Sequence, residues 1–221
     1  MTADMSPQSS SFADLEFVAH TIAQTAVDNE KAFGDLDAVV GDGDFGYSLA
    51  RGFEMVLAEW DTFDRSDPGV FLQKIALVIS KRVGGTSGPL WGTAFLRAAS
   101  AVKGKTDVSG ADVVAMLRAA AEGIKMRGKS DVGDKTLLDA LVPMTDAIES
   151  QLSSGEDTSP AEVARVAAAA ARTAADATTQ MQAMRGRASY TGERSIGSPD
   201  AGAVAIAVMA EHVSAAWPAS S

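Results

Sequence analysis

The chain has 221 residues, 46% of them hydrophobic, which is enough for one sizeable core and one folded domain. Its formal net charge of −10 argues against nucleic acid and anionic membranes as partners. The chain contains no cysteine, which excludes disulfides and zinc–thiolate sites, and it shows neither a secretory signal nor an apolar run of membrane-spanning length, so we expect a soluble cytoplasmic protein.

Hydrophobic periodicity predicts an all-α fold. Apolar residues recur at helical spacing, and no alternating run bounded by hairpin turns is present. Residues 1–10 are expected to form a disordered tail, and residues 11–221 a single helical domain. Eight helices are predicted, at residues 11–33, 47–60, 70–82, 89–102, 111–126, 135–152 and 160–184, with the last ending near residue 217.

The connections between these helices alternate in character. Short loops make successive helices antiparallel neighbours, so the first, third, fifth and seventh loops meet at one end of an up-and-down array. These four loops are rich in glycine and lie at residues 34–46, 83–88, 127–134 and 185–202. The loops at the other end are plain polar turns. The alternation therefore predicts that the functional residues lie together at one end of the array, which we call the rim.

Within the first of these loops, the stretch at residues 36–46 holds three glycines and three aspartates: Asp37, Asp42 and Asp44. Two unit charges ~4 Å apart repel by about 4 kcal/mol at an effective dielectric near 20, so a bound cation would relieve the cluster. Carboxylate oxygens with no cysteine or histidine beside them suit Mg²⁺ or Ca²⁺. A solvated turn capped by aspartates is the plainer alternative. We favour the metal because the three aspartates directly precede a new helix.

Three familiar motifs overlap these loops, and none accounts for them. Residues 41–46 match the dinucleotide fingerprint GxGxxG, but the aspartates within it would repel phosphate unless a metal intervened. A calcium-binding EF-hand loop starting at Asp42 fails because its twelfth position is Phe53 and not glutamate. Residues 123–130 match the P-loop in letters, but a helix precedes them where a strand is needed. Metal-bridged phosphate binding remains.

The other glycine-rich loops add further phosphate chemistry. Thr86 and Ser87 offer hydroxyls just before a helix N-terminus, which suits an anion site, a helix cap, or both. Asp134 is expected to cap the sixth helix, with Lys135 in its first turn. The last loop carries three arginines: Arg185, Arg187 and Arg194. They either bind phosphate through the guanidinium fork or pair with neighbouring acids, namely Glu193 or Asp200.

Taken together, four motifs resemble the DhaL family, the nucleotide-binding subunit or domain of dihydroxyacetone kinases. They lie at residues 36–44, 84–90, 133–136 and 186–197, so the likeness covers nearly the whole chain after residue 10. The resemblance implies an eight-helix antiparallel up-and-down barrel with the nucleotide at one rim. It also implies that two Mg²⁺ ions bind the phosphates of ADP or ATP and are held by Asp37, Asp42 and Asp44.

The resemblance further implies which residues contact the nucleotide: Phe45, Gly46, Tyr47, Ser48, Thr86, Ser87, Gly128, Leu137, Arg187, Asp200, Ala201 and Gly202. No catalytic residue is implied beyond this metal–nucleotide site, because a separate K subunit binds dihydroxyacetone or a related ketose. The chain would pass a phosphoryl group to that ketose and would be inactive without its partner. A homodimer is the other assembly considered.

Two departures from the family leave the phosphoryl source open. The residue after Asp44 is usually His in subunits served by the sugar phosphotransferase system and Cys in ATP-dependent kinases, but here it is Phe45. The stretch Asp200-Ala201-Gly202 stands where the family commonly has Asp-Pro-Gly, and the usual His of that loop is missing. We favour recharging of bound ADP by a phosphocarrier protein of that system, because the chain ends about four residues after its last predicted helix, as a free subunit would.

Three alternative functions stay open beside this one. The chain is otherwise the L subunit of an ATP-dependent ketose kinase of the erythrulose type, a nucleotide-binding regulator of a transcription factor, or a structural helical bundle. A neighbouring gene for a K subunit would favour the kinase, and failure to bind Mg–nucleotide would favour the bundle.

Overall fold

The computed structural model describes residues 11–85, 87–156 and 158–218, so the predicted tail at residues 1–10 lies outside the described part. All regular structure in the described residues is helical. The α-helices are α1 (Ser11–Asp28), α2 (Glu30–Asp37), α3 (Phe45–Ala58), α4 (Pro68–Arg82), α5 (Ser87–Ala101), α6 (Gly110–Gly128), α7 (Leu138–Ser153), α8 (Pro160–Ala177) and α9 (Ala201–Ala216). Three 3₁₀ helices are η1 (Trp60–Thr62), η2 (Thr178–Gln180) and η3 (Arg187–Ser195). None of the described helices is long and apolar enough to cross a membrane.

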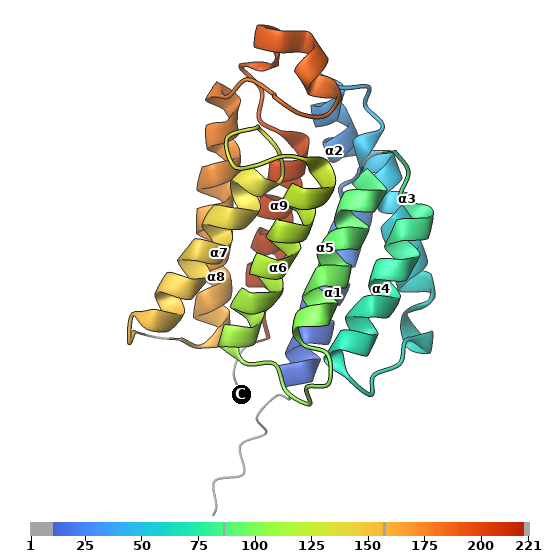
Figure 1. Ribbon diagram of the computed structural model, residues 1–221, viewed down its shortest axis with the longest axis vertical. Helices are drawn as coiled ribbons and strands as arrows, with labels where there is room; N and C mark the ends of the chain where they lie inside the picture. Colours follow the sequence, from blue (N-terminus) through green and yellow to red (C-terminus); the bar gives the residue numbers. More distant parts are fainter. Residues whose placement is uncertain (1–10, 86, 157, 219–221) are drawn as a thin grey trace, which may run out of the picture.

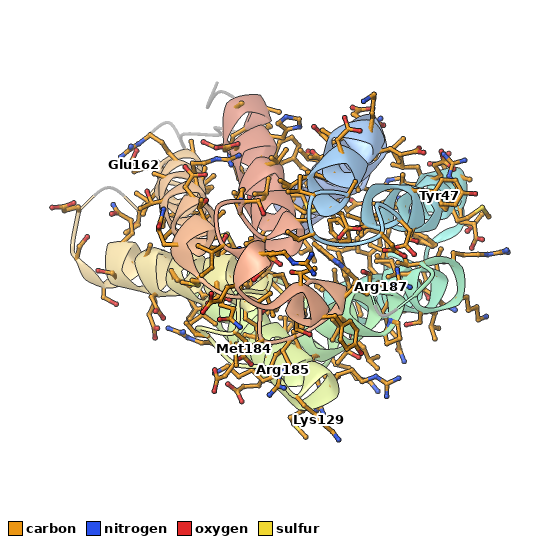
Figure 2. All side chains as sticks on the ribbon, turned by 90° about the horizontal axis from the view of Figure 1, so that it is seen from above. Tyr47, Lys129, Glu162, Met184, Arg185 and Arg187 are labelled. Atoms are coloured by element: carbon orange, nitrogen blue, oxygen red, sulfur yellow. The ribbon has the colours of Figure 1, made fainter. Side chains whose placement is uncertain are left out.

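The longer helices form a closed ring (Figure 1). Each helix from α3 to α8 packs against the next one in the chain, α1 packs against α3, and α9 returns to α1. The view from above in Figure 2 looks down this ring. The short helix α2 packs against α3 at the upper end, where the four glycine-rich connections also lie. The four glycine-rich loops therefore share one end of the ring, as predicted (Figure 1).

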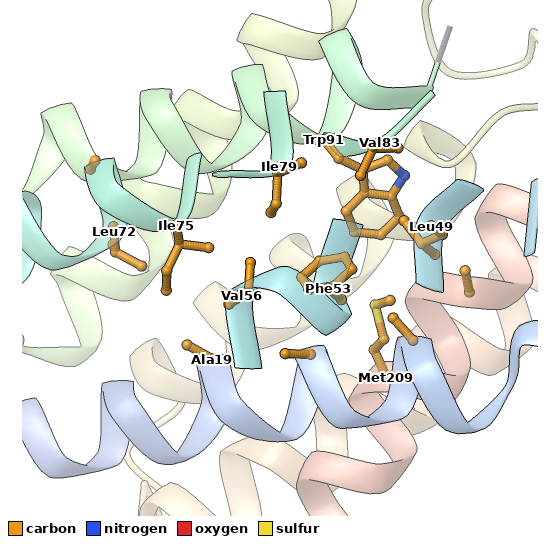
Figure 3. Close-up of a cluster of buried hydrophobic side chains, with 14 of the residues drawn as sticks. Ala19, Leu49, Phe53, Val56, Leu72, Ile75, Ile79, Val83, Trp91 and Met209 are labelled. Carbon is orange, nitrogen blue, oxygen red and sulfur yellow. The ribbon is translucent and has the colours of Figure 1, made fainter. Parts of the chain in front are cut away.

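Apolar side chains fill the ring in two clusters. The first joins α1, α3, α4, α5 and α9, and Figure 3 shows Phe53 at its centre with Trp91 nearby, ring centroids 6.2 Å apart. The second joins α6, α7, α8 and α9, where the buried residues of α8 are all alanines. Alanine favours the helix and leaves room for close packing. An apolar cavity of about 550 Å³ also lies between the helices of the ring.

The predicted first helix, residues 11–33, is interrupted near its end, because the helix breaks at Asn29. The side-chain Nδ2 of Asn29 donates to the Thr25 carbonyl at 2.9 Å, and its backbone leaves the helical region at φ −105°, ψ 17°. Asparagine competes in this way with the helical hydrogen bonds. A new helix, α2, then runs to Asp37. The acidic loop between α2 and α3 is thus shorter than expected and spans residues 38–44.

The predicted seventh helix is too long. Helix α8 ends at Ala177, η2 follows, and Met181 is extended. The hydroxyl of Thr178 donates to the Ala175 carbonyl at 2.6 Å and accepts from the Asp200 amide at 2.8 Å. The chain therefore turns at Thr178 because a distant residue meets it there. The predicted loop at residues 185–202 is also partly helical, since it contains η3 and the first turn of α9.

The predicted cap of the sixth helix is wrong as well. Helix α7 begins at Leu138, and the carboxylate of Asp139 in its first turn accepts from the Gly133 and Thr136 amides at 2.5 and 2.7 Å. Asp134 instead accepts from the Asp131 amide at 3.0 Å. Lys135 therefore lies in the loop before the helix.

Candidate metal and phosphate site

Three carboxylates converge where α2 ends and α3 begins. Asp37 is the last residue of α2, Asp42 lies in the connecting loop, and Asp44 occupies the N-cap position of α3. One oxygen from each carboxylate lies within 4.8 Å of the other two. This spacing suits oxygen ligands around a hard divalent cation. The structure thus brings the three predicted metal ligands together.

Backbone contacts hold this acidic loop in place. The Gly43 amide donates to Asp37 Oδ2 at 2.9 Å. A side chain at Gly41 would clash with the Asp37 carboxylate, and one at Gly46 would clash with the Glu30 carbonyl. Only glycine allows so close an approach of the backbone. The glycines of the motif therefore serve the packing of α3 across α2 as well as access to a ligand.

Arg187, the first residue of η3, reaches the same carboxylates. Its Nη1 donates to Asp44 Oδ2 at 2.9 Å and also to Asp42 Oδ2. Figure 2 labels Arg187 well inside the outline of the molecule. The alternative of pairing with Glu193 or Asp200 is wrong for this residue, because its ion pairs are with the acidic loop. The last loop thus brings a positive charge to the carboxylate cluster.

The other two arginines of the last loop lie elsewhere. Arg185 pairs with Asp134 at 3.3 Å, and Arg194 Nε donates to the Thr191 carbonyl at 3.5 Å. Within the described part of the chain, Arg187 is therefore the arginine of this loop that meets the acidic cluster.

Phe45, the residue that departs from the family pattern, faces the core. Its side chain is buried and packs against Phe33, with ring centroids 6.1 Å apart. A phenylalanine suits this position because it contributes to the first hydrophobic cluster. Only the backbone of Phe45 can therefore approach a ligand at the rim.

Tyr47 and Ser48 point in different directions. The Tyr47 ring is 58% exposed and lies 5.3 Å from the guanidinium of Arg51, near the outer edge of the molecule in Figure 2. Ser48 faces the connection between α4 and α5, since a Cβ added at Gly84 would lie 3.4 Å from Ser48 Oγ. Ser48 therefore joins the acidic loop to the next rim loop, whereas the Tyr47 side chain stands apart from the carboxylates.

The connection between α4 and α5 supplies a helix N-terminus. Thr86 lies outside the described residues. Ser87 begins α5, so its amide is among those without a helical partner. Such amides favour a nearby anion.

Across the rim, Leu137 meets the start of α9. A Cβ added at Gly202 would lie 3.2 Å from the Leu137 Cβ. Asp200 caps the helix through a 2.8 Å bond from the Ala203 amide to Oδ2, and Ala201 is the first helical residue. The predicted residues 200–202 and Leu137 thus form one cluster.

Gly128, the remaining predicted residue, ends α6. A Cβ there would lie 3.2 Å from Leu90 of α5. Gly128 therefore marks the place where α5 and α6 approach each other at the rim.

The acidity of Asp200 is unusual. Burial raises the pKa of this carboxyl to about 7, the hydrogen bond from Ala203 opposes that rise, and nearby Asp139 adds to it. Removing a carboxylate from water disfavours its charged form. The cap of α9 consequently changes its charge near neutral pH.

Sequence reasoning missed Lys135. The sequence places it in the first turn of the sixth helix, but in the structure it is only 2% exposed and its ammonium is bonded to three backbone carbonyls. No local pattern signals this burial, because the three carbonyls lie more than forty residues further along the chain.

The fold and the rim together define a class of protein. Three carboxylates, one arginine paired with two of them, and helix N-termini lie at the same end of the helical ring. Carboxylates with a divalent cation, a guanidinium and free backbone amides are the groups that hold a polyphosphate. The rim of this helical domain thus carries the kinds of group that metal-bridged phosphate binding requires.

Comparison with known proteins identifies the family. Residues 39–215 match the DAK2 domain, and the chain belongs to the DhaL family of dihydroxyacetone kinase subunits. It is 38% identical, over 82% of its length, to the PEP-dependent dihydroxyacetone kinase, ADP-binding subunit DhaL, of Escherichia coli, and covers 85% of that subunit. It is 39% identical, over 87% of its length, to the L-erythrulose 1-kinase of Mycolicibacterium smegmatis, but covers 33% of that protein.

A solved structure has the same fold. The crystal structure of the dihydroxyacetone kinase of C. freundii matches with a TM-score of 0.72 at 23% identity, covering 97% of this chain and 36% of that one. A complex of that kinase with AMP-PNP and Mg²⁺ matches equally well. The predicted all-helical class is confirmed.

Proposed function

We propose that this chain is the nucleotide-binding phosphotransferase subunit of a dihydroxyacetone kinase or of a kinase for a related ketose. It holds Mg–ADP or Mg–ATP at the rim and passes the phosphoryl group to a ketose bound by a separate K subunit. The observation that carries the proposal is the meeting of Asp37, Asp42, Asp44 and Arg187 at one end of the ring. The relative in E. coli, which is named an ADP-binding subunit, supports it.

Two Mg²⁺ ions are held by Asp37, Asp42 and Asp44. The donor set fits, because all three ligands are carboxylates and their oxygens lie within 4.8 Å of one another. Mg²⁺ is usually bound through one or two carboxylates together with substrate phosphates. When bound, the ions neutralise the charge of the phosphates.

Arg187 then binds the transferring phosphoryl group. Its guanidinium is tied to the same carboxylates, so it is placed beside the phosphates that the metals hold. Fixed positive charge where negative charge develops is the main source of rate enhancement in phosphoryl transfer.

The nucleotide lies across the rim between two sets of residues. One set is the start of α3 and α5: the backbone of Phe45, Gly46 and Tyr47, the Ser48 hydroxyl, and Thr86 and Ser87. The other set holds the nucleoside end: Gly128, Leu137, Asp200, Ala201 and Gly202. The contacts of Ser48 with Gly84, and of Leu137 with Gly202, support this division because each joins two rim segments.

The ketose is activated on the partner and not on this chain. The two histidines, His20 and His212, lie on α1 and α9, and His212 is hydrogen-bonded to Thr25 at 3.0 Å. His20 stacks edge-on against Trp60. Neither belongs to the rim, in keeping with a ketose that is bound by the K subunit, and we place both partners in the cytoplasm.

Bound ADP is recharged by a phosphocarrier protein. The relatives that this chain spans over 85% and 86% of their length are named PEP-dependent in E. coli and PTS-dependent in Lactococcus lactis. Use of ATP as a co-substrate is the second candidate, because the erythrulose kinase of M. smegmatis is equally similar at 39% identity. Phe45 does not decide between them, since its side chain is buried.

One set of reactions tests these proposals. The chain is mixed with a K subunit, Mg²⁺, dihydroxyacetone and ATP, and product is counted per chain. We expect a single burst that resumes only when phosphocarrier and phosphoenolpyruvate are added, and no product from the chain alone. Sustained turnover on ATP would establish the second candidate. Nucleotide binding without transfer from any donor would favour a regulator, and sedimentation of the same sample would reveal a homodimer.

A further inference from the structure

Residues 181–200 cross the rim between η2 and α9, and we call them the strap. The strap contains η3 and with it Arg187. In Figure 1 it forms the orange segment at the upper end of the ring. Its Tyr190 side chain is 88% exposed, so part of the strap stands clear of the helices. The contacts that hold the strap therefore determine the position of Arg187.

Lys135 binds the strap at three points. Its Nζ donates to the carbonyls of Met181 at 3.1 Å and Ser198 at 2.7 Å, and to that of Ser195. An ammonium group has three N–H donors, and all three are used. Met181 and Ser198 lie near the two ends of the strap, and Ser195 ends η3. One side chain therefore gathers both ends of the strap.

This arrangement is unfavourable for an isolated lysine. Burial lowers the pKa of Lys135, and nearby Asp200 opposes that fall. The backbone of Lys135 is left-handed at φ 59°, a region that costs an L-residue energy. An apolar side chain would fill the same space without burying a charge. What the ammonium adds is the connection among three carbonyls.

Further bonds of the strap lie close to these points. Ser195 Oγ accepts from the Ala183 amide at 2.9 Å and donates to the Gly192 carbonyl at 2.6 Å. The Met184 amide donates to the Asp134 carbonyl at 3.0 Å, next to Lys135 in the chain. Arg187 itself reaches across to the acidic loop. The strap is thus fixed at its ends by the Lys135 loop, and its tip carries the arginine.

We propose that Lys135 is a positioning residue for phosphoryl transfer and acts through Arg187. By tying Met181, Ser195 and Ser198 together, it fixes η3 so that the guanidinium lies over Asp42 and Asp44. Lys135 donates to backbone carbonyls of the strap, so its effect on the reaction is indirect. A displacement of about 1 Å at a reacting group can cost 100-fold in rate. The proposal rests on the proposed function for its catalytic consequence.

The first experiment measures the strap in the free chain, without metal or nucleotide. Lys135→Met keeps the length of the side chain and removes its donors. We expect hydrogen exchange to become at least tenfold faster at residues 186–196 and to stay unchanged in α3, α4 and α5. The control is Phe71→Leu, which weakens the core at the far end of α4. Unchanged exchange of the strap in Lys135→Met would overturn the proposal.

A second variant covers the case in which Lys135→Met does not fold. Lys135→Gln keeps two donors on a shorter side chain, and we expect it to loosen the strap less than methionine would. The same exchange measurement applies to it. If hydrogen exchange at residues 186–196 in Lys135→Gln matches that of the unaltered chain, the third hydrogen bond of Lys135 does not help to hold the strap.

The second experiment is a double-mutant cycle on phosphoryl transfer with the K subunit. We expect Lys135→Met to lower kcat by about 10- to 100-fold, with the KM for ketose unchanged. In the Arg187→Gln background the same change should lose almost nothing more, because its effect passes through the arginine. Additive losses would overturn the proposal. If the unaltered chain transfers no phosphate, the proposed function fails, and the exchange experiment still decides the role of Lys135.

Discussion

Arg187 Nη1 lies 2.9 Å from Asp44 Oδ2, although the two residues are 143 positions apart in the chain. The same guanidinium contacts Asp42, so it neutralises two of the three carboxylates that are the proposed ligands of Mg²⁺. A metal ion and a guanidinium compete for the same oxygen lone pairs. If the proposed metal binds, we therefore expect it to free the arginine for phosphate.

Arg187→Gln should have opposite effects on metal and nucleotide. Without the competing guanidinium, we expect Mn²⁺ alone to bind about two- to fivefold more tightly, since an exposed ion pair is worth about 0.2–1 kcal/mol. ADP in the presence of Mg²⁺ should bind about tenfold more weakly, because a charge-assisted bond to phosphate is lost. Electron paramagnetic resonance of Mn²⁺ and calorimetry of ADP measure the two affinities. Arg185→Gln is the control, and weaker Mn²⁺ binding in Arg187→Gln would contradict the competition.

Asp42→Asn should weaken Mg–ADP binding at least tenfold and leave the fold intact. In the described structure the side chain of Asp42 is hydrogen-bonded only to Arg187. The carboxylate of Asp37, by contrast, accepts a hydrogen bond from the Gly43 amide, and this bond holds the loop. Asp42→Asn therefore removes a metal ligand without disturbing the backbone. Calorimetric titration and the thermal midpoint test this. The control is Asp35→Asn on α2, whose partner is Lys31, and near-normal affinity in Asp42→Asn would rule out the metal site.

Asp200→Asn should change how stability depends on pH. The folded pKa of Asp200 is about 7, above its ordinary 3.8, so its ionisation increasingly disfavours the folded state as pH rises from about 4 to 7. Asparagine caps a helix as well as aspartate and does not titrate. Relative to the unaltered chain, the variant should gain stability across that range and stay level above pH 7. Urea unfolding of the metal-free chain from pH 4 to pH 8 measures this.

Asp112→Asn should show a pH dependence of the opposite sign when the same urea unfolding is extended down to pH 2. Hydrogen bonds from Lys105 and Ser109 lower the pKa of Asp112 to about 2, so its contribution is present above about pH 4 and is lost as pH falls toward 2. The variant should be less stable than the unaltered chain at pH 7, with a deficit that shrinks in acid. A stability difference for Asp200→Asn that does not vary with pH would contradict the raised pKa.

Ala167→Leu and Ala171→Leu should differ although both alanines are buried on α8. Ala167 lines the 550 Å³ cavity, and Ala171 does not. Each added methylene that finds room contributes about 0.8 kcal/mol, whereas overpacking a filled core costs about 1–3 kcal/mol. We expect the thermal midpoint to rise or hold for Ala167→Leu and to fall for Ala171→Leu. Equal losses at both positions would mean that the cavity cannot accept a side chain.

The sequence by itself determined the helical class, the shared end of the four glycine-rich loops and the acidic cluster. These follow from local information, because hydrophobic spacing specifies a helix and short connections force antiparallel neighbours. The three aspartates fall within a stretch of eight residues, so a single short loop suffices to bring them together. The family motifs rest on the same short stretches.

Only the tertiary structure decided the end of α8 at Ala177, the buried face of Phe45 and the contact of Arg187 with Asp42. It also decided that Lys135 lies inside the protein, where carbonyls from a distant segment meet it. Each of these features depends on a partner far away in the chain or on which face of a helix is covered. Local propensity carries no information about such partners, because they exist only after the ring has closed.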